Sequence, residues 1–397
     1  MTMYNRNPDI AFTRNPIRFT DIRPLAQLQR AFNVMVGASS IVEGVPVYVG
    51  HYTAPATIDI SEICDAYVPS IPDPEDGFSF GDTKTMIQLE GPVDFQNRYI
   101  VVTSVEMQPL KPAFYALRGG VSPQNFRRLA ELDADIFSAR LLDKRHNFFL
   151  TTRTHGWRIV MDELELYPLT FVNLEDTPES VIEVKAVGTE YAVTMENKER
   201  GIYAIDIEGV RGWIAREKGY LGSVFDVVCD GYLACQIVIK EASPELTDTV
   251  VKFRNSLGAY ELLHLTGTLT KKPILDEMKS DGRRYESSTG RFERMTPRRS
   301  VTHVYDTASG FKDNDELGFL LDMAASDEVY IRRKQGWVRV IPSLEGISAT
   351  DPQLEPTSVN VTLTLAEARD NQTPDITSLD DFERPRIFSD EHTDEFN

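Results

Sequence analysis

The stretch Val250–Thr270, VVKFRNSLGAYELLHLTGTLT, joins two apolar runs through a short polar segment, Asn255-Ser256-Leu257-Gly258. Both runs are rich in residues that favour strands, and Asn and Gly readily adopt the left-handed backbone angles that tight turns need. The pattern predicts a β-hairpin in which Asn255 and Gly258 are the structural turn residues. This hairpin opens the C-terminal part of the chain and follows a larger β-rich part.

The composition is that of a folded globular protein with more than one core. The chain has 397 residues, of which 41% are hydrophobic and 10% aromatic, so two to four domains are expected. Its formal net charge of −19 disfavours sequence-independent binding to nucleic acid, because the phosphate backbone would be repelled. The three cysteines, Cys64, Cys229 and Cys235, show no disulfide or zinc spacing, and we expect them to be buried hydrophobes in a protein made in a reducing cytoplasm.

The N-terminal residues lack the basic-then-apolar pattern of a signal peptide. No segment approaches the ~20 apolar residues of a membrane-spanning helix. We therefore expect no membrane span and synthesis in the cytoplasm.

The pattern of elements predicts a mainly β fold of two to three serial β-sandwich (Ig-like) domains, with one long and one short inserted helix. The long helix is expected from Ser122 to Leu141, where it closes a sheet face or contacts another subunit. The short helix is expected after the capping box Asp313-x-x-Glu316. The predicted parts are an N-terminal β-sandwich (1–110), a helix-containing connector (111–166), a central β-sandwich (167–244), a C-terminal β domain with the NSLG hairpin and a basic loop (245–369), and an acidic C-terminal tail (370–397).

Two further patterns bear on the central and C-terminal regions. Asp230-Gly231 and Gln335-Gly336 are placed as hairpin turns between alternating strands. The four glycines between positions 209 and 222 match no phosphate-binding loop, and no helix is expected to follow them. We therefore expect neither a nucleotide site nor any other cofactor.

Charge is distributed unevenly near the C-terminus. Residues 271–299 hold nine basic and five acidic residues, a local charge of +4, whereas ten acidic residues face three basic ones from Ala366 onward. A basic segment of this kind is commonly a solvated loop, but in an assembly-forming protein it is a candidate docking strip for an acidic tail that orders against a partner. The predicted assembly interface consists of Lys271, Lys272, Arg283, Arg284, Arg291, Arg294, Arg298, Arg299, Asp380, Asp381, Asp390, Glu391, Asp394 and Glu395.

No catalytic motif is present in the sequence. The six histidines never fall at HxH, HxxxH or HExxH spacing, so no metal site is expected. The alternating acids Asp162, Glu163 and Glu165 are compatible with a glycosidase pair, but an exposed strand face explains them as well. A glycan-binding β-sandwich module remains an alternative to an assembly role, and it would present exposed aromatic residues such as Trp157, Trp213, Tyr220 or Trp337 to sugar rings.

Several motifs resemble those of one protein family. The segment 253–261, FRNSLGAYE, resembles the x-N-S-L-G-G-[aromatic]-[DE] hairpin of β-rich virion proteins of Bacteroidetes tailed phages, including crAss-like phages and related prophages. The segment 320–331, LLDMAASDEVYI, is similar to that family's LL-x-L-x-x-S-x-E-V-Y-L segment, and FTRNPI (12–17) and IDISEI (58–63) are similar to its opening motifs. Ala259 departs from the pattern, because a second glycine is usual there.

The resemblance implies a non-catalytic structural component of a phage or phage-derived tail, neck or baseplate, made in the bacterial host. It implies a homo-oligomeric ring or adaptor whose partners are other virion tail, neck and fibre proteins, with a host-surface glycan reached through a bound fibre. The alternative from the composition is a glycan-binding adhesin or receptor-binding module.

Overall fold

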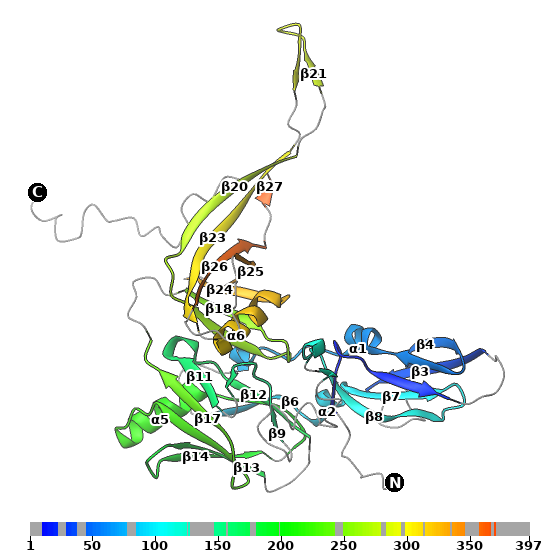
Figure 1. Cartoon of the computed structure of the whole chain (residues 1–397), viewed down its shortest axis with the longest axis vertical. Helices are drawn as coiled ribbons and strands as arrows, with labels where there is room; N and C mark the ends of the chain where they lie inside the picture. The colour runs from blue at the N-terminus through cyan, green and yellow to red at the C-terminus, as the bar shows by residue number, and fades with distance from the viewer. Residues whose placement is uncertain are drawn as a thin grey trace, which may run out of the picture. The chain divides into compact units, whose positions relative to one another are not determined.

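The chain is described by a computed structural model, which we report for residues 10–22, 29–37, 45–77, 85–124, 126–127, 147–155, 158–174, 180–197, 199–242, 249–278, 283–294, 298–312, 314–333, 336–345, 357–366 and 369–370. The fold is mainly β, with several sheets and few helices, which confirms the predicted class (Figure 1). It separates into two compact units, each described by itself below. The first contains residues 1–244, 253–264 and 313–326, and the second contains 245–252, 265–312 and 327–397. The serial domain boundaries predicted above stay a prediction.

A five-stranded sheet forms one part of the first unit. Its strand order is β1 (Ile10–Phe12), β8 (Pro109–Leu117), β7 (Tyr99–Ser104), β3 (Gln29–Val36) and β4 (Pro46–Thr53). The side chains of Phe32, Val34 and Val102 from this sheet are buried in one core. The short strands β2 (Arg18–Asp21) and β5 (Ala56–Asp59) pair with each other beside the same core. Residues 61–63 of the IDISEI motif begin helix α1 (Ser61–Tyr67), which buries Cys64.

Two further sheets of the first unit share a second core. The six-stranded sheet runs β10 (Thr154–His155), β11 (Arg158–Asp162), β17 (Tyr232–Lys240), β16 (Val224–Cys229), β13 (Ser180–Ala186) and β14 (Ala192–Asn197). The four-stranded sheet runs β6 (Met86–Glu90), β15 (Gly201–Ile205), β12 (Leu169–Asn173) and β9 (Asn147–Phe149). Strand β6, which we grouped with the N-terminal strands, pairs antiparallel with β15, 110 positions and more away in the sequence. The predicted Asp230-Gly231 turn joins β16 to β17 as expected.

Helix α5 (Ile207–Lys218) is a correction to the all-β reading of the central region. Asp206 accepts a hydrogen bond from the Gly209 N–H as its N-cap, and Gly219 ends it in the left-handed conformation at φ 66°. Ile207, Val210 and Ile214 are buried in the shared core. The glycines at 209 and 212, which suggested a loop, lie inside this helix.

The remaining helical elements of the first unit are short. They are α2 (Pro92–Gln96) and the 3₁₀ turns η1 (Pro74–Gly77) and η2 (Glu163–Glu165). The long helix predicted for 122–141 lies almost wholly outside the described residues, of which 123–124 and 126–127 are helical. The short predicted helix is confirmed as α6 (Asn314–Ala325).

A buried ion pair joins Glu90, the last residue of β6, to Arg98, which follows α2. The Arg98 side chain is fully buried and donates to both carboxylate oxygens of Glu90, at 2.7 and 2.5 Å. It also donates to the carbonyls of Pro69 and Ser70. Four bonds to one guanidinium satisfy both the charge and the geometry that burial of an ion demands.

The second unit is built on one large antiparallel sheet. Within this unit the order is β18 (Thr249–Arg254), β24 (Val329–Arg333), β25 (Gly336–Glu345), β26 (Thr357–Leu365), β23 (Arg298–Lys312) and β20 (Thr270–Met278), with β27 (Arg369–Asp370) paired to β23. The hairpin of β24 and β25 forms as predicted. In the described part of the chain, no helix is long and apolar enough to cross a membrane.

The basic segment 271–299, predicted as a loop, is mostly strand. β20 pairs with the first half of β23 from Thr270–Asp306 to Met278–Arg298. Between them lies a separate two-stranded sheet of β21 (Arg283–Glu286) and β22 (Arg291–Arg294). The charge of the segment suggested a solvated loop, but the backbone pairs in two antiparallel ladders.

Candidate functional site

The predicted hairpin is formed by β18 and β19 (Tyr260–Leu265), and its tip, residues 253–264, belongs to the first unit. Asn255 shapes the turn through its side chain and not through a left-handed backbone: its Oδ1 accepts hydrogen bonds from the N–H groups of Leu257 and Ala259, both at 3.0 Å. Gly258 does adopt the left-handed region, with φ 96°. A Cβ at Gly258 would lie 2.4 Å from the Arg118 carbonyl oxygen, so the turn also needs glycine for close packing.

Hydrogen bonds donated by the Asn255 amide group and the Ser256 N–H hold the turn to acceptors elsewhere in the first unit. Asn255 Nδ2 donates to the Leu150 carbonyl at 2.9 Å and to Glu261 Oε2 at 2.6 Å. The backbone N–H of Ser256, in the turn, donates to the Asp322 carboxylate on α6. The hairpin tip is therefore fixed from several directions by polar groups distant in sequence.

A group of charged side chains lies beside the tip. His264, which is fully buried, has its Nδ1 2.7 Å from Asp162 Oδ2, and its backbone N–H donates to Glu165 Oε1 at 2.9 Å. Arg153 pairs with Glu165 Oε2 at 2.5 Å and donates to the Leu262 carbonyl. Asp162 and Glu165 also form the capping box of η2. These carboxylates are thus committed to structural bonds, which argues against the glycosidase pair considered from the sequence.

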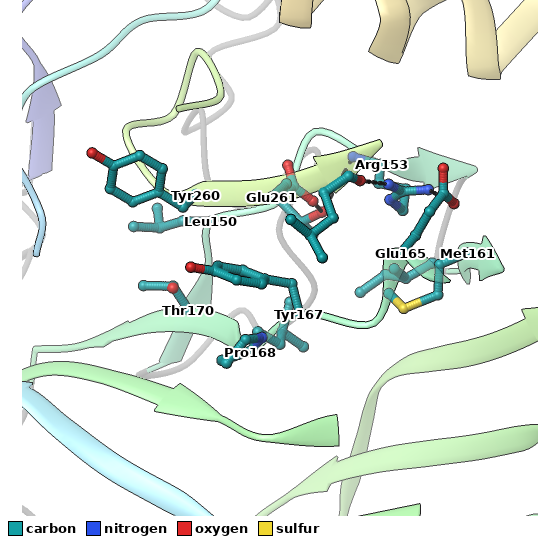
Figure 2. A pocket seen from close by; sticks show the side chains of 13 residues that line it. Leu150, Arg153, Met161, Glu165, Tyr167, Pro168, Thr170, Tyr260 and Glu261 are labelled. Atoms are coloured by element: carbon teal, nitrogen blue, oxygen red, sulfur yellow. Dashed lines mark hydrogen bonds and ion pairs between the residues drawn. The ribbon is translucent and has the colours of Figure 1, made fainter. Parts of the chain in front are cut away.

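A small cavity adjoins this group (Figure 2). Its volume is about 20 Å³, room for roughly one water molecule and far too little for a sugar. Thr170, Tyr167, Tyr260 and Glu261 line it, and the buried Thr170 Oγ1 has no hydrogen-bond partner in the protein. Burial raises the pKa of the Glu261 carboxyl and of the Tyr167 hydroxyl, which donates to Asp73. Among the described residues, no group of three or more His, Cys, Asp or Glu side chains could hold a metal ion.

The basic residues of the predicted interface lie on four strands of the second unit. Lys271 and Lys272 are on β20, Arg283 and Arg284 on β21, Arg291 and Arg294 on β22, and Arg298 and Arg299 on β23. The strands β20 and β23 pair to form one ribbon, and β21 and β22 form a separate two-stranded sheet. The six acidic residues predicted to meet them, Asp380, Asp381, Asp390, Glu391, Asp394 and Glu395, lie outside the described residues.

An open groove of about 620 Å³ runs along one face of the sheet at the base of this ribbon, lined from β20, β23, β25 and β26. Lys272 Nζ lies 2.5 Å from Asp306 Oδ2 within it, and Thr362 donates to the same carboxylate. The Lys272–Asp306 hydrogen bond raises the pKa of Lys272 and lowers that of Asp306. Both side chains are solvated, so the pair contributes little to stability.

The two-stranded sheet β21–β22 carries an exposed aromatic pair. Tyr285 and Phe292 are directly opposite in the register, with ring centroids 5.2 Å apart, and are 56% and 69% exposed. Sequence reasoning missed this pair because the surrounding charge dominated the segment. The signal that could have found it is the polar turn Ser287–Gly290 with one aromatic residue on each side, Tyr285 before it and Phe292 after it.

The aromatic residues considered for glycan binding are not open platforms where they are described. Trp213 and Tyr220 are partly buried against the core of the first unit. Trp337 is half-buried, and the Lys252 ammonium lies 4.7 Å from its ring centroid. Trp157 lies outside the described residues. The geometry therefore gives the glycan-binding alternative no specific support.

No protein-family model matches the chain, and no curated protein matches it. Among solved structures, it is similar to a chain in the virion of a native gene transfer agent particle, at 17% identity and a TM-score of 0.20, over 33% of this chain and 100% of that one. It is also similar to a chain in the tail of an empty gene transfer agent particle with C6 symmetry, at 16% identity and a TM-score of 0.19, over 32% of this chain and 95% of that one. At these TM-scores the likeness carries no argument about fold or function.

Proposed function

We propose that the protein is a non-catalytic structural component of a phage or phage-derived tail, neck or baseplate, built into a multi-subunit ring or adaptor. The ribbon of β20 and β23 carries this proposal. Residues 304–306 of β23 are paired on both sides, with β20 and with β26, whereas residues 298–303 continue along β20 beyond the end of β26. Among the described residues, only Ser300 and Val301 pair there with a further strand, β27.

A two-stranded ribbon that leaves its sheet cannot bury its own faces. Isolated two-stranded structures are at best marginally stable in water, and they gain stability when another surface covers them. A ribbon of this length is therefore expected to be covered by another chain, and assembly supplies that chain.

Charge supports contact between copies of the protein. The segment 271–299 has a formal charge of +4 in a chain of net charge −19, so the remaining residues have a net charge of −23 (−19 minus +4). The acidic C-terminal residues of one copy are proposed to meet the basic ribbon of its neighbour. Opposite charges across such a contact set register and partner choice more than affinity.

The motif resemblance supports the tail, neck or baseplate class and a location in the virion. The matching residues are the NSLG turn and the segment that follows from α6 into β24. We further propose that the sheets of the first unit are arranged as Ig-like sandwiches and that fibre or other tail proteins are partners.

Self-assembly of the purified chain tests the proposal. We expect a species larger than a monomer by sedimentation velocity, rings by negative-stain microscopy, and weaker assembly as salt rises, because the contact is charged. A chain that stays monomeric over a wide concentration range at low salt overturns the homo-oligomeric part of the proposal.

Deletion of residues 370–397 tests the proposed acid-to-ribbon contact. We expect the deletion to weaken assembly. The matched control keeps the length and replaces the six acidic interface residues between 380 and 395 by Asn or Gln, which should weaken assembly to a similar extent if charge is the cause. Unchanged sedimentation of both variants rejects the contact.

A further inference from the structure

The hairpin β21–β22 has two chemically different faces. Because strand residues alternate between faces, the directly opposed pair Tyr285–Phe292 lies on one face, and the neighbouring pair Glu286–Arg291, which has opposite charges, lies on the other. The first face is here called the aromatic face, and the second the charge-paired face.

The aromatic face is unfavourable for a hairpin that stays alone in water. Tyr285 and Phe292 are 56% and 69% exposed, and Arg284 and Arg291 directly precede them in the sequence. A surface that is both apolar and acidic would cover the rings and attract the arginines.

We propose that the aromatic face of the β21–β22 hairpin docks on an acidic surface of a second copy of this chain. Charge complementarity selects this occupant, because the residues outside 271–299 carry −23 while the hairpin residues 283–294 carry four arginines and two glutamates. Aromatic residues and arginine are the side chains that most often dominate binding energy at protein interfaces. The proposal rests on the assembly function above and names the residues that make the contact.

The aromatic pair also has a local role that the test must separate from docking. A cross-strand pair of rings stiffens a hairpin whether or not a partner is present. Replacing both rings by Thr keeps a high preference for strand and removes the apolar surface. The double variant Tyr285→Thr/Phe292→Thr therefore removes docking while it favours retention of the hairpin backbone.

The experiment compares three full-length chains by sedimentation velocity. The first is the unaltered chain, and the second is Tyr285→Thr/Phe292→Thr. The third is the control Glu286→Arg/Arg291→Glu, which exchanges charges on the other face and leaves the net charge unchanged. We expect the dissociation constant for self-association to rise about 30-fold or more in the Thr variant, as for the loss of an interface hot spot. The control should associate as the unaltered chain does.

Each outcome separates the two proposals. If the unaltered chain does not associate, the assembly function fails and the docking proposal falls with it. If it associates and the Thr variant associates equally well, the docking proposal fails and the assembly function stands. Equal losses in the Thr variant and the control also overturn it, because the effect is then not specific to one face.

A second measurement addresses nucleic acid, the other class that a basic, aromatic face could bind. Fluorescence anisotropy with a labelled mixed-sequence DNA duplex is expected to show no binding at the salt concentration at which the chain self-associates. Binding that the Thr variant loses, while self-association is unchanged, would replace the second copy by nucleic acid as the occupant.

Discussion

The substitution Asn255→Asp probes the turn at the hairpin tip with almost no change in shape. The new carboxylate can still accept from the N–H groups of Leu257 and Ala259, but the two bonds donated by Nδ2 are lost. One of these goes to the Glu261 carboxylate at 2.6 Å and the other to the Leu150 carbonyl at 2.9 Å. The substitution therefore isolates the donor side of the side chain.

The expected loss follows from these two bonds. A hydrogen bond to a charged group contributes about 1.5–3 kcal/mol, and a buried acceptor left without a donor costs about 1–3 kcal/mol. Their sum predicts that Asn255→Asp lowers the free energy of unfolding by roughly 3–5 kcal/mol near neutral pH. Repulsion between the new carboxylate and Glu261 adds to this loss.

The loss should depend on pH with a definite sign. Burial already raises the pKa of Glu261, and a second carboxylate beside it raises the folded-state pKa values of the pair further. Groups whose pKa is raised on folding bind protons more tightly in the folded state. The loss of stability caused by Asn255→Asp is therefore largest at pH above the folded-state pKa values and becomes smaller as the pH falls through them. Urea unfolding at pH about 8 and about 5, followed by tryptophan fluorescence, measures the difference.

A double variant provides the control. In Asn255→Asp/Glu261→Gln the glutamine amide can donate to the new carboxylate, so the coupling between the two substitutions should restore a good part of the loss. A loss below about 1 kcal/mol at neutral pH, or one that is equal at both pH values, would refute the account of the turn.

Three further substitutions have expected outcomes. Arg98→Met should destabilise the first unit by about 3–5 kcal/mol, because it leaves the buried Glu90 carboxylate without its partner. In thermal unfolding, Arg98→Met/Glu90→Leu should recover most of this stability, and no recovery would show that the ion pair is not the cause. Gly258→Ala should lower the melting temperature markedly, since its Cβ would meet the Arg118 carbonyl at φ 96°, and an unchanged melting temperature would contradict the close packing. Thr170→Val should be neutral or stabilising in urea unfolding because it removes a buried hydroxyl without a protein partner; a loss above about 1 kcal/mol would indicate a water bound in the adjoining cavity.

Local patterns predicted local structure well. The hairpin around Asn255, the Asp230-Gly231 turn and helix α6 depend on a few neighbouring residues, and each element forms where its residues indicate. Helix α5 was missed although Asp206 and Gly219 are ordinary cap residues, because two glycines in its first half lowered its apparent helix preference.

Structure that depends on distant residues was not accessible from the sequence. Strand β6 alternates as well as any N-terminal strand, and nothing local says that its partner is β15. The bonds from His264 to Glu165 and from Arg153 to the Leu262 carbonyl join positions 99 and 109 residues apart.

The division into two units also constrains the order in which the chain can fold during synthesis. The first unit takes residues 1–244 and then two later pieces, 253–264 and 313–326, with segments of the second unit between them. A ribosome must therefore release residue 326 before the first unit holds all its parts, so the bond between the Ser256 N–H and Asp322 of α6 forms only after most of the long ribbon has been made. A nascent chain stalled before α6 should remain protease-sensitive at the hairpin tip, and one stalled well beyond α6 should resist cleavage there.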